Sequence, residues 1–131
     1  MSWIYEISTG RLYPPGQPYI ATGYSGGNCG KNPDGVNNPA LCDTHCIGPI
    51  PTGMYRHGLV VDHSSLGNYA IPLLPFEANE MYGRSGFFMH GDNPAMNKSA
   101  SEGCIIMPYT IRQKFYNSTI NILEVVAVKT D

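Results

Sequence analysis

Two residues in the second half of the chain have side chains suited to nucleophilic catalysis, Cys104 and His90. Cys104 follows Gly103 and precedes an apolar segment, so its thiol would stand at the lip of a strand. Gly103 would allow close approach of a substrate, and the consecutive backbone N–H groups of Gly103 and Cys104 could stabilise an oxyanion. His90 ends the apolar run 87–90, where a strand can hold an imidazole rigidly. A thiol needs a base or a lowered pKa to attack as a thiolate, and a nearby histidine supplies both.

Each of these residues also has a common structural role. A lone cysteine is among the residue types most often buried, and on spacing alone Cys104 is more often inert than reactive. A histidine at the end of a strand is likewise more often a hydrogen-bonded core residue. The combination of His-Gly-Asp at 90–92 with Ser-Glu-Gly-Cys at 101–104 favours a catalytic pair over two unrelated core residues.

The elements that would position this pair are mostly short strands. Alternating or β-branched apolar residues bounded by turns are typical of strands, and Pro108 suits the first residue of a helix. The last segment is β-branched and long enough to be central in a sheet. The pattern predicts strands at 3–7, 11–13, 19–24, 54–62, 69–74, 86–90, 104–107 and 120–128, and one short helix at 109–116.

Composition agrees with a compact, turn-rich, mostly β domain. The 131 residues include 15 glycines and 11 prolines, which would interrupt long helices, and 42% are hydrophobic, which excludes disorder. The net charge of −2 gives no basic footprint for nucleic acid. We expect a single domain over 1–131, built as a β-sandwich or a curved mixed sheet.

The N-terminus has neither the charged nor the apolar region of a signal peptide, and no apolar run approaches the ~20 residues that span a bilayer. The sequence therefore predicts a protein made in the cytoplasm without a signal peptide and without membrane insertion. Activity outside the cytoplasm would require another export route.

Residues 25–53 form a segment rich in glycine, proline and cysteine, which predicts a long ordered loop or a capping subdomain. Cys29, Cys42 and Cys46 lie here, together with His45. Their separations do not match a zinc ribbon or finger, so a disulfide between two of the three is favoured over a zinc site.

Four ordered blocks of the chain resemble the L,D-transpeptidase (YkuD-like) catalytic domain. They are Ala-Thr-Gly-Tyr-Ser-Gly at 21–26, Gly-Pro-Ile-Pro-Thr-Gly-Met-Tyr at 48–55, Gly-Arg-Ser-Gly-Phe-Phe-Met-His-Gly-Asp at 83–92 and Ser-Glu-Gly-Cys-Ile at 101–105. The segments are similar to a branch of short proteins without signal peptides that includes L,D-transpeptidase effectors of the type VI secretion system.

The resemblance implies that Cys104 is the nucleophile and His90 the general base. It implies that the carbonyl of Gly91 orients the imidazole, and that the N–H groups of Gly103 and Cys104 line the oxyanion hole. Asp92 is a rival for orienting the imidazole, because a carboxylate two residues away could reach back.

The substrate-binding residues are less sharply defined. Ser101 matches a serine or threonine of the family. Glu102 and Ile106 differ from the family pattern. The family commonly has histidine in place of Glu102 and arginine or asparagine in place of Ile106. Arg84 would share a strand face with His90, roughly 20 Å away, and could bind a stem-peptide carboxylate or form a surface ion pair.

Other aromatic residues and histidines carry weaker expectations. Tyr24 and Tyr82 lie inside the matched blocks and are the tyrosines expected to line a groove, with Asp92 beside the substrate. His57 and His63 are expected at the surface or in turns.

For function, the resemblance implies a peptidoglycan-modifying enzyme that acts on tetrapeptide stems and needs no metal or organic cofactor. Its activities would be L,D-carboxypeptidase and L,D-transpeptidase or D-amino-acid exchange through a cysteine thioester. An antibacterial effector of this kind would act in the periplasm of a target cell, with a cognate immunity protein and a carrier in the secretion machinery. Two alternatives stay open: another cysteine amidase or endopeptidase, and a non-catalytic wall-binding module.

Overall fold

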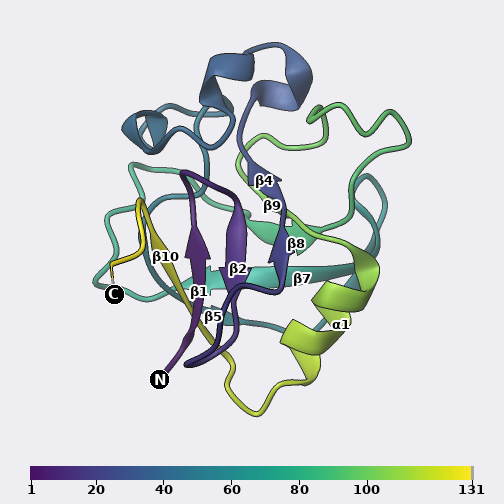
Figure 1. The fold of residues 1–131 in the computed structure, drawn as a ribbon. Coiled ribbons are helices and arrows are strands. Elements are labelled where there is room, and N and C mark those ends of the chain that lie inside the picture. The colour runs from purple at the N-terminus through teal and green to yellow at the C-terminus, as the bar shows by residue number, and fades with distance from the viewer. Residues whose placement is uncertain (131) are drawn as a thin grey trace.

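The computed structural model describes residues 1–130 and is mostly β, with one α-helix and three short 3₁₀ helices (Figure 1). The elements in chain order are β1 (Trp3–Glu6), β2 (Arg11–Tyr13), β3 (Ala21–Thr22), β4 (Tyr24–Ser25), the 3₁₀ helices η1 (Asn28–Gly30), η2 (Pro33–Gly35) and η3 (Pro39–Leu41), β5 (Gly53–His57), β6 (Val61–His63), β7 (Gly67–Pro75), β8 (Phe88–His90), β9 (Ile105–Ile106), α1 (Tyr109–Asn117) and β10 (Ile122–Val126).

The strands form one mixed, nearly closed sheet in the order β3-β2-β1-β10-β5-β7-β8-β9-β4, and β6 pairs with β7 beside this path. Two pairs are parallel, β1 with β10 and β8 with β9, and the others are antiparallel. The predicted mostly β class with one helix is therefore confirmed. The expectation that the last strand is central is also confirmed, since β10 lies between β1 and β5.

Two predicted strands are each divided in the structure. The segment 54–62 separates into β5 and β6, and 19–24 separates into β3 and β4 at Gly23. A Cβ on Gly23 would collide with the carbonyl oxygen of Ile106, so glycine is needed where the chain passes β9 closely. Pro108 is the extended residue before α1 rather than its first helical residue.

The core lies between the sheet and α1, which packs on β7 and β8. Phe115 of α1 is fully buried and meets Trp3 of β1 edge to face, with ring centroids 5.3 Å apart. Tyr5, Tyr55, Ile71, Met89, Ile105 and Leu123 are other large side chains with no exposed area. Within residues 1–130 no helix has the length and apolar character needed to cross a bilayer.

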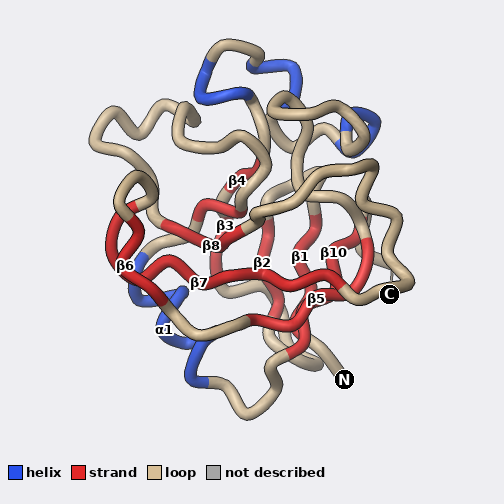
Figure 2. The backbone as a smooth tube through the Cα atoms, turned by 180° about the vertical axis from the view of Figure 1, so that it is seen from behind, coloured by secondary structure: helices blue, strands red, loops and turns tan. Residues whose placement is uncertain are grey.

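The segment 25–53 carries the three 3₁₀ helices and stands over one end of the sheet, next to the loop that joins β8 to β9 (Figures 1 and 2). The predicted disulfide in this segment is wrong, because Cys29, Cys42 and Cys46 are all free thiols. Cys42 is buried beneath the segment with its thiol 3.6 Å from the carbonyl of Ile50, whereas Cys29 and Cys46 are exposed.

Candidate active site

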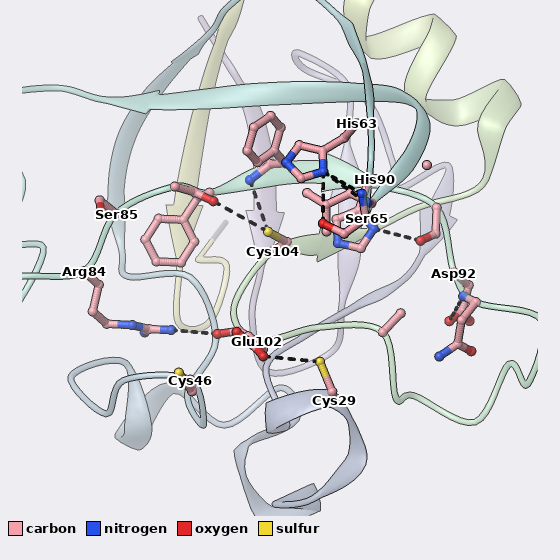
Figure 3. A pocket seen from close by; sticks show the side chains of 18 of the residues that line it. Cys29, Cys46, His63, Ser65, Arg84, Ser85, His90, Asp92, Glu102 and Cys104 are labelled. Carbon is pink, nitrogen blue, oxygen red and sulfur yellow. Dashed lines mark hydrogen bonds between the residues drawn. The ribbon is translucent and has the colours of Figure 1, made fainter.

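The parallel pairing of β8 with β9 brings His90 and Cys104 to one face of the sheet. Met89 is level with Ile105 and both are fully buried. Because successive residues of a strand point to opposite faces, His90 and Cys104 point away from that part of the core. Both line one cavity of about 860 Å³, and Figure 3 shows their side chains together in it.

The Cys104 thiol is mostly shielded from water. The backbone N–H of Phe88 donates to its Sγ at 3.3 Å, and the thiol faces the carbonyl of Gly86 at 4.0 Å (Figure 3). Burial raises the pKa of Cys104 to about 11, and the Glu102 carboxylate acts in the same direction. The thiol is therefore protonated at neutral pH, and attack requires a base at the moment of reaction.

His90 is held in the tautomer that such a base needs. Its Nδ1 lies 2.8 Å from the carbonyl of Gly91, which can only accept, so Nδ1 carries the proton. Nε2 is buried and has no hydrogen-bond partner among residues 1–130. Burial lowers the pKa of His90, and the nearby charges of Arg112 and His63 add to that effect. The imidazole is thus neutral, with a lone pair available on Nε2.

Gly91 occupies the orienting place that the resemblance implies, and Asp92 does not. The Asp92 carboxylate accepts hydrogen bonds from the Tyr24 hydroxyl at 2.7 Å and from the N–H of Asn93 at 2.9 Å. These bonds turn it away from the imidazole and tie the β8–β9 loop to β4, while Asp92 still borders the cavity.

Ser101 does not reach the cavity, contrary to the prediction that it binds substrate. It is fully buried, and its Oγ accepts from the N–H groups of Gly26 and Gly103, each at 2.9 Å. The same hydroxyl donates to the carbonyl of Cys104 at 2.6 Å. Ser101 therefore braces the loop that carries Cys104.

This brace also changes the predicted oxyanion hole. The N–H of Gly103 is occupied by Ser101, so it does not point to a substrate oxygen. Of the predicted pair, the N–H of Cys104 has no acceptor among the residues that the structure describes. The N–H of Phe88, which contacts Sγ, is a donor that the sequence did not indicate.

Arg84 lies beneath the loop that carries Cys104 and not on a strand face, because β8 begins at Phe88. The predicted surface ion pair is wrong, since the side chain is buried. Its guanidinium donates to four carbonyls, those of Cys42, Pro49, Gly48 and Glu102, at 2.7–3.2 Å. Arg84 thus fastens segment 25–53 to the loop, and it also borders the cavity, as the prediction that it lines a groove requires.

Gly103 is required directly above Arg84. Its φ is +139°, and a Cβ there would lie 2.6 Å from Nη2 of Arg84 and 2.8 Å from the Phe87 ring. Both the backbone conformation and the lack of space exclude a side chain.

Other cavity residues come from segments that the sequence did not connect with the site. His63 of β6 packs edge to face on Phe88 with ring centroids 5.4 Å apart, and it borders the cavity. The β6–β7 pairing folds it there, so no local motif marked it. Cys29 and Cys46 border the cavity from the opposite side, and Cys29 donates to the Glu102 carboxylate at 3.6 Å (Figure 3).

Three aromatic or histidine predictions are corrected by these positions. Tyr24 is buried behind the cavity wall, where its hydroxyl links Asp92 to the N–H of Ala100. Tyr82 is exposed and lies outside the cavity lining. His57 is part of β5 and packs against Phe115 rather than lying at the surface.

Comparison with known proteins gives one finding. The family model described as the Tlde1 domain matches residues 20–131, a range that contains every residue of this site. Neither a curated protein nor a solved structure matches the chain significantly.

Proposed function

Because the chain belongs to the Tlde1 domain family, a family of type VI secretion effectors with cell-wall-related activity, we propose that it is a cysteine enzyme that cuts the tetrapeptide stems of peptidoglycan. One observation supports this more than any other. The buried, unpartnered Nε2 of His90 and the thiol of Cys104 lie on the same sheet face in one cavity. A neutral base beside a protonated thiol is the arrangement that acyl transfer needs.

The first step forms a thioester. Nε2 of His90 takes the thiol proton as Sγ of Cys104 attacks the carbonyl carbon of the third stem residue. The N–H of Cys104 stabilises the oxyanion. The imidazolium then returns its proton to the leaving nitrogen, the peptide bond breaks, and the terminal D-alanine departs.

The second step determines the product. His90 deprotonates a water molecule that attacks the thioester, which releases the tripeptide stem and restores the thiol; this is L,D-carboxypeptidase activity. An amine in place of water gives D-amino-acid exchange or a cross-link between stems. The cavity is open enough, at about 860 Å³, to admit either acceptor.

Membership of the family supports a place of action in the target cell. An effector delivered by type VI secretion meets peptidoglycan in the periplasm of the target cell, and the producing cell then needs an immunity protein against it. Recognition by the secretion machinery would require a carrier.

Mass spectrometry of purified muropeptides tests the proposal. Wild-type protein is expected to remove one alanine from tetrapeptide stems, and Cys104→Ala is expected to leave them intact. Cys42→Ala is the matched control, because that thiol is buried outside the cavity. Circular dichroism of all three proteins verifies folding.

Other cleavage patterns would contradict the proposal. Cleavage at the lactyl amide or within a cross-link would identify an amidase or an endopeptidase. Unchanged muropeptides with retained binding would identify a wall-binding module.

A further inference from the structure

A second cavity of about 660 Å³ adjoins the one that holds Cys104 and His90. The two share Leu66, Gly67, Gly91 and Asp92 in their walls. A single ligand could therefore occupy both cavities, with one part in the second cavity and another part beside Cys104. The proposed reaction gives this second cavity no role.

Arg112 of α1 is the charged residue at the inner wall of the second cavity. It is only 6% exposed, and its Nη1 donates to the carbonyls of Asn68 and Tyr69 at 3.0 and 2.9 Å. Its Nε is buried and has no acceptor among residues 1–130, and both hydrogen bonds of the guanidinium come from Nη1. The positive charge of a buried guanidinium is only partly balanced by neutral carbonyls. The guanidinium can therefore bind an anion through its remaining N–H groups.

The position of this guanidinium relative to the base is tightly fixed. A Cβ on Gly91 would lie 3.0 Å from Nη2 of Arg112, so the guanidinium lies directly against the residue whose carbonyl accepts from His90. The Tyr109 ring covers it, with the guanidinium carbon 5.6 Å from the ring centroid. These contacts leave the guanidinium little freedom, which lowers the entropic cost of binding a ligand.

Two carboxylates border the same cavity at its exposed rim, those of Asp62 and Asp92. Asp62 accepts a weak hydrogen bond from the N–H of Tyr69 at 3.3 Å, and Asp92 is bound to Tyr24 and Asn93. Their negative charge opposes a simple anion and favours a ligand that carries an ammonium next to its carboxylate.

We propose that Arg112, Asp62 and Asp92 form a subsite for the head of an α-amino acid, in which Arg112 binds the carboxylate and the two aspartates attract the ammonium. The source of the head rests on the proposed function. It belongs either to the side chain of the diaminopimelate residue in the stem or to a free D-amino acid that acts as acceptor.

Binding is tested without catalysis, by NMR titration of the Cys104→Ala protein with three probes. D-Alanine carries both charges, propionate only the carboxylate, and D-alaninamide only the ammonium. D-Alanine is expected to shift the amide signals of Gly91 and Asn68 at a concentration at least tenfold lower than the other two. Equal effects of all three probes, or no effect on these signals, would overturn the proposal.

Two substitutions test the roles of the charges. Arg112→Lys keeps the charge but loses the planar fork, and it is expected to weaken D-alanine binding about tenfold. Asp62→Asn keeps an oxygen for the Tyr69 N–H and is expected to weaken it a few-fold. Ser8→Ala, exposed and remote, is the control. Unchanged affinity in both charge variants, with folding intact, would refute the subsite.

Kinetics separates the two sources. If the head belongs to diaminopimelate, Arg112→Lys raises KM for tetrapeptide in hydrolysis and in exchange, and it abolishes discrimination against a stem with lysine at the third position. If it belongs to the acceptor, only KM for the free D-amino acid rises. A loss of kcat alone would assign Arg112 a purely structural role. D-Alanine binding without stem cleavage would refute the proposed function and leave the subsite standing.

Discussion

The Ser101→Ala substitution tests whether the hydroxyl braces the loop that carries Cys104 or binds substrate. The substitution removes the acceptor for the N–H groups of Gly26 and Gly103 and the donor to the carbonyl of Cys104. A hydroxyl has one donor and two acceptor sites, so every hydrogen-bonding site of Ser101 is used in the structure. Nothing remains with which it could bind a ligand.

The magnitude follows from these three buried bonds. A typical intramolecular hydrogen bond contributes about 1 kcal/mol net, and a buried group left without a partner costs about 1–3 kcal/mol. Because the loop can relax in part, we expect Ser101→Ala to lower the free energy of unfolding by about 2–4 kcal/mol. For a domain of this size the melting temperature should fall by about 10 °C.

Urea denaturation followed by circular dichroism measures the effect, with the exposed Ser8→Ala as the control that should change by less than about 0.5 kcal/mol. A double-mutant cycle with Ser25→Ala adds a sharper test. Ser25 donates to the carbonyl of Gly103 at 2.8 Å while Ser101 accepts from its N–H, so the two serines hold the two peptide units that flank the Cα of Gly103. We expect a coupling energy of about 0.5–3 kcal/mol between them.

The activity of Ser101→Ala completes the test. A displaced loop misplaces Sγ of Cys104, so kcat for tetrapeptide cleavage should fall while KM changes little. Unchanged stability together with a raised KM would refute the brace and restore the prediction that Ser101 contacts substrate.

Four further predictions concern protonation and packing. Burial lowers the pKa of His90. We therefore expect kcat/KM to stay level above pH 6.5 and to fall tenfold per pH unit only below the lowered pKa. A loss of kcat/KM that begins above pH 6.5 would contradict the buried neutral base. The unfolded chain binds that proton at higher pH than the folded one, so the free energy of unfolding should decrease as the pH falls below about 6.5, and His90→Gln should reduce this loss in denaturation measured across pH. The pKa of Cys104 is raised to about 11. The rate of its alkylation by iodoacetamide, measured by mass spectrometry, should therefore rise about tenfold per pH unit from pH 7 to 10. A rate that stops rising near pH 8 would show that the thiolate is already formed there. Arg84→Lys should lower the free energy of unfolding by about 2–4 kcal/mol, because an ammonium cannot reach four carbonyls at once. Arg56→Lys, at an exposed position, should have little effect. Equal losses of stability in the two variants would disprove the role of Arg84 in fastening segment 25–53 to the loop.

Local patterns in the sequence were sufficient to predict the class of fold and most strands. Apolar alternation identified β1, β2 and β7 within about two residues, and Pro108 helped to place the helix α1. The divided strands were missed because Gly23 and Gly58 interrupt apolar runs that otherwise look continuous. The need for a glycine at a close approach is visible only once the neighbouring backbone is in place.

The site was predictable only in part, for the same physical reason. His90, Gly91 and Cys104 could be predicted as candidates because their spacing along the chain resembles a known motif, and the structure places them beside one cavity. The parts played by Arg84 and Ser101 depend on which carbonyls and N–H groups the fold brings around them, and no local pattern contains that information. His63 reaches the cavity only through the β6–β7 hairpin, so nothing in its own neighbourhood indicated it.

The parallel pairing of β1 with β10 has a consequence for the order in which the molecule folds. Trp3 lies level with Leu123, so almost the whole chain must be synthesised before the first strand finds its neighbour. Contacts this distant in sequence close slowly, because the loop-closure entropy is lost before the contact stabilises anything. Since β10 also separates β1 from β5, a ribosome-bound chain without it has two half-sheets with unpaired edges. Completion of the sheet is therefore a late event in synthesis, and until then the edges of β1 and β5 are open to pairing with other chains.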